Sequence, residues 1–289
     1  MTSQRANLVG SIWMIAAMAL FAIEDALLKA VASTVPVSQV LILFGGGGAL
    51  IFAALARREG SPLAPKDVTS RPMLIRAVFE VFGRLFYTLA FVLTPLSSTT
   101  VILQATPLVV VGAAAVLFGE TVGWRRWAAI FLGLAGVVII IQPGSNSFTP
   151  LSILAVLGML GFAGRDLASR AAPANLSTAI LGLYGFFALI AAGALFAVFE
   201  AKPFVPITLE TGLIMAAACG VGVIAYTALM RAMRTGEVSA VTPFRYSRLL
   251  FGLALGLFVF GEALTQQMIF GSVLIVLSGL FILWRGKSA

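Results

Sequence analysis

Two stretches of this chain follow one pattern, and they decide the fold. Residues 97–143 read SSTTVILQATPLVVVGAAAVLFGETVGWRRWAAIFLGLAGVVIIIQP, and residues 239–285 read SAVTPFRYSRLLFGLALGLFVFGEALTQQMIFGSVLIVLSGLFILWR. An offset of 142 places the Gly-Glu pair at 119–120 on the pair at 261–262. Each stretch holds two apolar segments joined by a short link. The pattern therefore predicts a pair of apolar helices that occurs twice.

The beginning of each half repeats as well. Residues 22–25 (AIED) align with residues 163–166 (AGRD) at a spacing of 141. The period is therefore about half the chain, far above the roughly 20–50 residues of solenoid repeats. In an apolar chain, duplication on this scale is typical of transporters built from two structural repeats. We expect residues 1–145 and 146–289 to form two equivalent five-helix units.

The composition places the chain in a membrane. Of its 289 residues 60% are hydrophobic and 10% charged, whereas about a quarter of the residues of a soluble domain are charged. The sequence has no histidine, which excludes histidine-based nucleophilic sites and HExxH zinc sites. The net charge of +8 does not indicate nucleic-acid binding, because the basic residues are scattered over links and helix ends. We expect no cofactor and no metal.

Apolar segments of roughly 20 residues, the length that crosses a bilayer, occur ten times. They are residues 8–30, 38–56, 73–93, 98–118, 124–141, 150–170, 178–199, 210–231, 239–260 and 266–284. Five spans in each half is an odd number, so two halves with one fold must have opposite orientations. The sequence therefore predicts an all-α membrane protein with ten transmembrane helices in two inverted five-helix repeats, working by alternating access.

Basic residues mark one side of this ten-span arrangement. They are Arg5, Arg57, Arg58, Lys66, Arg71, Arg125, Arg126, Arg170, Arg231, Arg234, Arg285 and Lys287. The links on the opposite side contain Lys202. By the positive-inside rule, we expect both termini in the cytoplasm and the chain in the inner membrane.

Two phrases of the sequence resemble a known family. They are PLVVVGAAAVLFGE at residues 107–120 and PFRYSRLLFGLALGLFVFGE at residues 243–262, and together with the ten spans they are similar to the EamA-type permeases of the drug/metabolite transporter superfamily. The resemblance covers essentially the whole chain. It implies a bacterial exporter of L-amino acids, with the aromatic amino acid exporters as the nearest branch and other neutral amino acids included.

Other functions remain open at this stage. The chain could export or import another small metabolite or a drug-like solute, and the resemblance leaves the energy source and the oligomeric state open, with a monomer favoured. An intramembrane enzyme is disfavoured, because no histidine, metal cluster or nucleophile–base spacing occurs. A scaffold or receptor would not explain the duplication. The expected partners are a small-molecule substrate and membrane lipid.

The third predicted span carries three charges on one stripe. Arg76, Glu80 and Arg84 follow one another at spacings of four, which places them on one helical face. They could form a ladder of ion pairs that neutralises itself. Alternatively, the stripe lines a cavity, with Arg76 and Glu80 in a charge network and Arg84 in contact with substrate.

The ninth predicted span brings two further arginines after a proline. Pro243 is expected to kink the helix, because proline removes one backbone hydrogen bond. Arg245 is expected to extend to the cytoplasmic boundary. Arg248 and Tyr246 are candidates for substrate binding.

The first and sixth predicted spans carry aspartates at equivalent places. Asp25 and Lys29 are four residues apart, and so are Asp166 and Arg170. This spacing predicts a local ion pair in each helix, within a wider charge network.

The neighbouring positions differ in sign between the halves, with Glu24 in the first and Arg165 in the second. Glu24 is a candidate for the cationic group of a substrate, and Arg165 for the charge network. Aromatic residues in the spans around the centre complete the predicted substrate site. They are Trp13, Phe82, Tyr87 and Phe162.

Glycines and prolines supply candidates for gating. Four consecutive glycines in the second predicted span favour either close helix packing or a hinge. They are Gly45, Gly46, Gly47 and Gly48. Pro107 and Pro243 offer bending points in the fourth and ninth spans. The Gly-Glu pairs at 119–120 and 261–262 are expected to end one helix and cap the next.

Overall fold

The computed structural model describes residues 3–93, 102–142, 149–260 and 265–285, and all regular elements in these ranges are helical. The longer helices are α1 (Ser3–Ala32), α2 (Val37–Arg58), α3 (Arg71–Leu93), α5 (Thr106–Leu117), α6 (Trp124–Ile141), α7 (Ile153–Ala171), α8 (Thr178–Glu200), α9 (Leu209–Arg234), α11 (Ser247–Phe260) and α12 (Gln266–Arg285). Short segments are α10 (Val238–Val241), η1 (Lys66–Thr69), η3 (Pro150–Ser152) and η4 (Thr242–Tyr246). The predicted all-α fold is confirmed.

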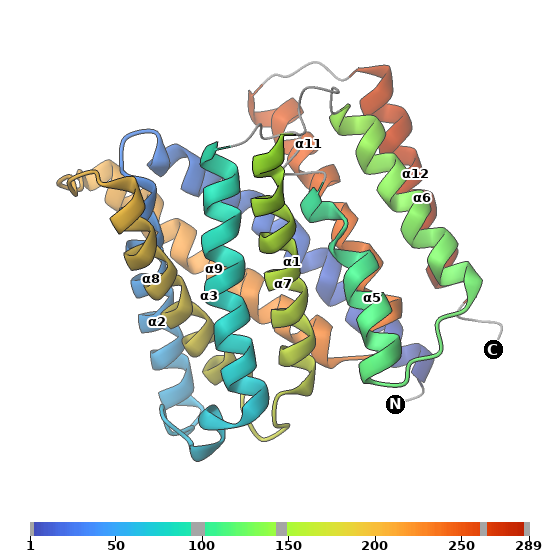
Figure 1. The fold of residues 1–289 in the computed structure, drawn as a ribbon, viewed down its shortest axis with the longest axis horizontal. Helices are drawn as coiled ribbons and strands as arrows, with labels where there is room; N and C mark the ends of the chain where they lie inside the picture. The colour runs from blue at the N-terminus through green and yellow to red at the C-terminus, as the bar shows by residue number, and fades with distance from the viewer. Residues whose placement is uncertain (1–2, 94–101, 143–148, 261–264, 286–289) are drawn as a thin grey trace.

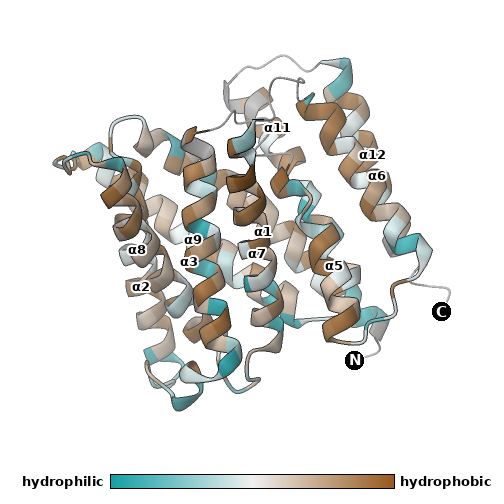
Figure 2. Cartoon of the chain, in the orientation of Figure 1, coloured by the Kyte–Doolittle hydropathy of each residue, from teal (hydrophilic) through white to brown (hydrophobic). Residues whose placement is uncertain are grey.

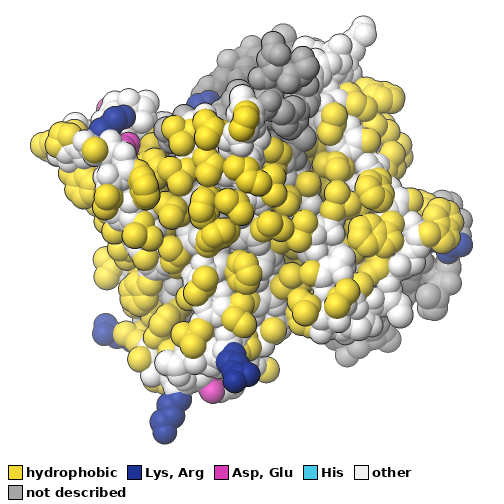
Figure 3. All heavy atoms as spheres, viewed as in Figure 1, with side chains coloured by type: hydrophobic (Ala, Val, Ile, Leu, Met, Phe, Trp, Pro, Cys, Tyr) yellow, Lys and Arg dark blue, Asp and Glu magenta, His cyan; other side chains and the backbone are white. Residues whose placement is uncertain are grey.

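Six described helices are long and apolar enough to cross a membrane. Together with the short η3 before α7, they cover the stretches Gln4–Ala32, Val37–Arg58, Trp124–Ile141, Pro150–Ala171, Thr178–Glu200 and Leu209–Arg234. Shorter apolar helices cover Ile102–Leu117 and Gln266–Phe281. Figure 2 shows hydrophobic residues along the helices. Hydrophobic side chains also dominate the face drawn in Figure 3. These features make the chain a multi-pass membrane protein, and the count of ten spans stays a prediction.

Helices from the first half of the chain lie along helices from the second half. The closest pairs are α1 with α9, α2 with α8, α3 with α7, and α6 with α12. Figure 1 shows them side by side, from α2 and α8 at one end of the molecule to α6 and α12 at the other. This pairing brings charged residues of α3 and α7 together near the centre.

The glycine run in α2 lies within an uninterrupted helix. Gly45 packs against the backbone of α8 at Phe186 and Ile190, and Gly48 packs against the ring of Phe186. A methyl group at either glycine would collide with α8, whereas Gly46 has no neighbour within 4 Å. The run thus allows close packing of α2 on α8, and its use as a hinge stays a prediction.

Glycines also bring α3 and α7 together. Gly83 of α3 faces Gly161 of α7, and Gly158 of α7 faces the backbone of Tyr87. Small residues at a helix interface let the two backbones approach closely. Side chains next to these glycines, among them Arg84, are therefore near the seam between the halves.

The two prolines lie at helix beginnings. Pro107 is in the first turn of α5, directly after a turn at Ala105. Pro243 is in η4, between α10 and α11. A proline in the first turn sacrifices no intrahelical hydrogen bond. The helical stretches 102–117 and 238–260 are thus interrupted just before or at the proline, as the predicted bending points require. A role of these bends in gating stays a prediction.

The carboxylate of Glu120, in the first half of the chain, caps a helix of the second half. Gly119 has the left-handed backbone conformation expected of it, with φ of 65°. Glu120 accepts hydrogen bonds from the backbone N–H groups of Val238 (2.8 Å) and Ser239 (2.9 Å) at the beginning of α10. The prediction that Glu120 caps the next helix, α6, is therefore wrong. The second pair, at 261–262, lies outside the described residues.

Candidate functional site

A buried carboxylate links three helices at the centre of the protein. Glu80 of α3 lies 3.1 Å from Arg165 Nη1 of α7. Its second oxygen accepts a hydrogen bond of 2.8 Å from the hydroxyl of Tyr226 on α9 and lies 3.7 Å from Arg76 Nη2. All four residues are buried. The predicted pair of Arg76 with Glu80 is confirmed, and it is part of a network between helices rather than a ladder within α3.

Arg76 has partners on three further helices, α7, α8 and α9. Its Nε donates to Ser169 Oγ at 2.9 Å, and its Nη2 donates to the carbonyl of Leu181 at 2.8 Å. The guanidinium also contacts the hydroxyl of Tyr226. Buried charges are tolerated when such partners replace water.

Asp166 of α7 joins one further arginine, Arg245, to the network. Its carboxylate lies 2.8 Å from Arg165 Nη2 and also pairs with Arg245 of η4. The predicted pair of Asp166 with Arg170 is wrong, and Arg170 instead reaches the carbonyl of Met233 at 3.4 Å. The expectation that Arg245 extends to the boundary is also wrong, because the buried aspartate holds it.

These residues are called here the inner ion network. Its charged members are Arg76, Glu80, Arg165, Asp166 and Arg245, and its polar members are Ser169 and Tyr226. Three cations and two anions leave one positive charge in excess. Sequence reasoning missed Tyr226 and Ser169 as members, although a buried hydroxyl in a span signals an unseen partner.

A second group of charged residues has fewer partners and is called the central polar site. Its members are Glu24, Asp25, Arg84 and Arg248. Glu24 of α1 is 4% exposed and lies against Gly222 of α9. Within the described residues its Oε2 atom has no hydrogen-bond partner, and neither has the buried Nε of Arg84 on α3. Glu24 interacts electrostatically with Arg84 and Arg248 without a direct ion pair to either. The buried Glu24 and the partly buried Arg84 thus each keep a buried polar atom without a hydrogen-bond partner.

The remaining charges of the central polar site pair with each other. Arg248 of α11 contacts Asp25 of α1, with Nε 3.0 Å from Oδ2. The exposed fractions of these side chains are 38% and 52%. No ion pair joins Asp25 to Lys29 in the described part of α1, so the predicted local pair is wrong. The ion-pair partner of Asp25 is therefore Arg248 from the other half of the chain, and not Lys29 one turn further along α1.

Aromatic rings hold the arginines of this region. The guanidinium carbons of Arg84 and Arg165 lie 5.7 and 5.0 Å from the ring centre of Phe162. Phe162 therefore lies between the central polar site and the inner ion network. Tyr87 packs on the same ring, with centroids 5.7 Å apart. Such cation–π contacts stabilise a charge and orient its plane.

Three of the predicted substrate-site residues lie elsewhere. Trp13 packs under Arg231, whose guanidinium carbon lies 4.8 Å from the centre of the Trp13 ring. Phe82 pairs with Phe86 at 4.5 Å between centroids. Tyr246 is buried and donates to the carbonyl of Ile130 at 3.2 Å. None of the described contacts joins them to the central polar site, and their role in substrate binding stays a prediction.

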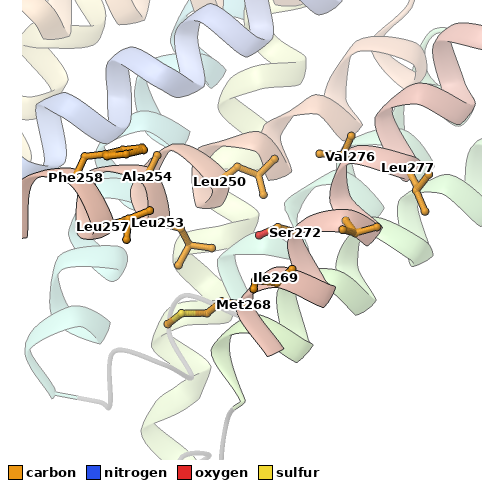
Figure 4. A pocket seen from close by; sticks show the side chains of 11 residues that line it. Leu250, Leu253, Ala254, Leu257, Phe258, Met268, Ile269, Ser272, Val276 and Leu277 are labelled. Atoms are coloured by element: carbon orange, nitrogen blue, oxygen red, sulfur yellow. The ribbon is translucent and has the colours of Figure 1, made fainter. Parts of the chain in front are cut away.

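The structure also has an apolar pocket of about 470 Å³ between α11 and α12. Leucines of α11 and Met268, Ile269 and Val276 of α12 line it, and Ser272 is a polar member (Figure 4). Its lining has no charged residue, so it is separate from the central polar site. No group of three or more acidic, cysteine or histidine residues able to hold a metal occurs in the described ranges.

Comparisons with known proteins agree with this architecture. Residues 8–142 match the model of the EamA-like transporter family. These residues thus form a domain of the EamA family. A solved crystal structure, 21% identical, has the same fold, with a TM-score of 0.80 over 96% of this chain and 97% of that one.

Relatives that align with most of the chain are named as transporters. The S-adenosylmethionine uptake transporter of Rickettsia prowazekii is 25% identical over 76% of this chain and 75% of its own length. The pseudopaline exporter CntI of Pseudomonas aeruginosa is 26% identical over 89% and 90%. The riboflavin transporter of Vibrio cholerae is 25% identical over 75% and 72%. The prediction of a small-molecule transporter, and not an enzyme, is confirmed.

Proposed function

We propose that this transporter moves zwitterionic solutes of the amino-acid type, which bind in the central polar site. The observation that carries the proposal is the pair of incompletely satisfied charges, Glu24 and Arg84. Leaving charged groups buried without partners is costly. A solute with one ammonium and one carboxylate would supply a partner to each, and a guanidinium binds a carboxylate strongly. Glu24 would then hold the ammonium and Arg84 the carboxylate.

The rings around this site favour an apolar or aromatic side chain on the solute. Phe21 lies 5.2 Å from the Arg248 guanidinium carbon, and Tyr87 and Phe162 pack beside Arg84. Aromatic and other neutral L-amino acids are therefore the first solutes to test. The relatives, which carry solutes as different as riboflavin and S-adenosylmethionine, make other small metabolites the alternative.

We further propose ten spans in two inverted repeats, residues 1–145 and 146–289. Helix contacts support this arrangement, because α1 packs on α9 while α3 packs on α7. In each contact, the first helix of one half packs on the third helix of the other half. The first helices are α1 and α7, and the third helices are α3 and α9. The central polar site takes residues from α1 and α3 and from α11, and substrates of inverted-repeat transporters bind at such a seam. Alternating movement of the halves would expose the site to each side in turn.

Both termini would then be cytoplasmic, and solutes would leave the cell. The outward direction rests on the resemblance to exporters. Topology can be tested with single cysteines in two links, Ser61→Cys after α2 and Lys202→Cys after α8. An impermeant thiol reagent should label position 202 in intact cells and position 61 only after permeabilisation. Labelling of both from outside would contradict the ten-span topology; the native Cys219 is buried.

The binding role of Arg84 can be tested in proteoliposomes. Removing a charged hydrogen-bond partner of the substrate costs on the order of 2 kcal/mol, or about thirtyfold in affinity. Arg84→Gln should therefore lower the affinity for a neutral amino acid about thirtyfold, with little effect on its amide, which lacks the carboxylate. Arg57→Gln, at the exposed end of α2, is the matched control. Equal losses for the acid and the amide would show that Arg84 does not bind the carboxylate.

A further inference from the structure

Arg248 differs from the other arginines near the centre in the way it is partnered. In the inner ion network, the arginine partner Asp166 is fully buried. Arg248 instead pairs with Asp25, whose side chain is 52% exposed. In a cavity where water reaches both charges, such an exposed ion pair stabilises a fold by only about 0–1 kcal/mol. Exchange of Asp25 for another carboxylate would therefore cost little.

In the contact between Arg248 and Asp25, the guanidinium binds only one of the two carboxylate oxygens. Both Nε and Nη2 of Arg248 meet one oxygen, Oδ2 of Asp25. A guanidinium fork can instead bind both oxygens of a carboxylate with two parallel hydrogen bonds. The ring of Phe21, 5.2 Å from the guanidinium carbon, helps to fix its plane. Arg248 is thus oriented for a carboxylate that could approach more favourably than Asp25 does.

The charges of the site lead to the same conclusion. If Asp25 moves aside, the central polar site presents two cations, Arg84 and Arg248, and one anion, Glu24. A solute that matches these charges has two carboxylates and one ammonium. Arg248 contacts Asp25, which directly follows Glu24 in α1, and Glu24 interacts electrostatically with both arginines.

We propose that Arg248 binds a second carboxylate of the solute, which displaces Asp25. Arg248 is then a specificity-determining residue that extends the substrate range to acidic amino acids and amino acids with a carboxyalkyl substituent. The inference rests on the proposed function, since it assumes that Glu24 and Arg84 hold the amino-acid group.

Glutamate and glutamine form a matched pair of probes, because they differ only in a carboxylate against an amide of similar size. Binding of each is measured by competition in proteoliposomes or detergent. Asp25→Asn should raise the ratio of glutamate to glutamine affinity by roughly tenfold, since it frees Arg248, and Arg248→Gln should lower that ratio by roughly tenfold. Lys29→Gln, one turn further along α1, is the control and should keep the ratio of the parent protein.

The outcomes separate this inference from the proposed function. A ratio that changes in neither variant, while Arg84→Gln weakens binding of both probes, overturns the role of Arg248 and leaves the zwitterion site standing. Binding of both probes that is insensitive to Arg84→Gln overturns the proposed function instead. If Asp25→Asn gives too little folded protein, Asp25→Ser provides the same readout, because serine also lacks the charge.

Discussion

The inner ion network and the central polar site contain the same kinds of residues but satisfy them differently. In the network, Glu80 and Asp166 have partners on several elements, and their side chains are buried. In the central polar site, Glu24 and Arg84 each keep a buried atom without a hydrogen bond in the described structure. Asp25 and Arg248 form the remaining pair, and it is exposed.

This difference indicates two uses of charge within apolar helices. The charges of the inner ion network connect α3, α7, α9 and η4 through ion pairs and hydrogen bonds. Removing one of these charges should therefore lower stability. Incompletely partnered charges stabilise the fold little and are available to a solute. The two regions meet at Phe162, which contacts arginines of both. Substitutions of matching type in the two regions should therefore separate stability from binding.

The largest effect on stability is expected for Asp166→Asn. Asp166 is the ion-pair partner of both Arg165 and Arg245. Removing one partner of a buried ion pair costs about 3–5 kcal/mol, because the other charge is left buried and uncompensated. The unfolding midpoint of the purified protein in detergent measures this loss.

The matched substitution is Asp25→Asn in the exposed pair with Arg248. Its effect on the free energy of unfolding should stay within about 1 kcal/mol, as for other exposed ion pairs. Equal losses from the two substitutions would break the distinction between the network and the site.

A second comparison concerns Glu80 and Glu24, for which replacement by glutamine should change stability in different ways. Glu80→Gln should lower stability by about 2 kcal/mol, because Arg76 and Arg165 lose a charged acceptor. Glu24→Gln should leave stability unchanged or raise it, because it replaces a buried carboxyl group that lacks a full set of hydrogen-bond partners. Unfolding midpoints of both variants test the signs. A strong loss of stability in Glu24→Gln would show that Glu24 has a structural role.

Within the inner ion network, the smallest effect is expected for a single hydroxyl. Tyr226→Phe removes the group that donates to Glu80 and contacts Arg76. One such hydrogen bond contributes about 1 kcal/mol to stability, so the unfolding midpoint should fall slightly. Tyr184→Phe on α8 is the control. A loss for Tyr226→Phe no larger than for this control would place Tyr226 outside the network.

Much of the fold follows from the sequence alone. Runs of apolar residues predict membrane helices, because a backbone in lipid must satisfy its own hydrogen bonds. The repeated phrases identified the family, and the spacing of Arg76 and Glu80 placed them on one face of α3. Arg84 and Glu24 could be singled out as well, since a charge within a span requires an explanation.

The partners of those charges came from the tertiary structure. Spacing of four predicted Lys29 for Asp25 and Arg170 for Asp166, because sequence shows only neighbours on the same helix. The fold instead brings Arg248 and Arg245 from the segment after α10 to these aspartates. A long basic side chain near a helix end can reach water, so Lys29 and Arg170 do not need an aspartate. Arg245, whose partner Asp166 is buried, lacks that choice. The packing of distant helices decides which carboxylate each of the two arginines meets.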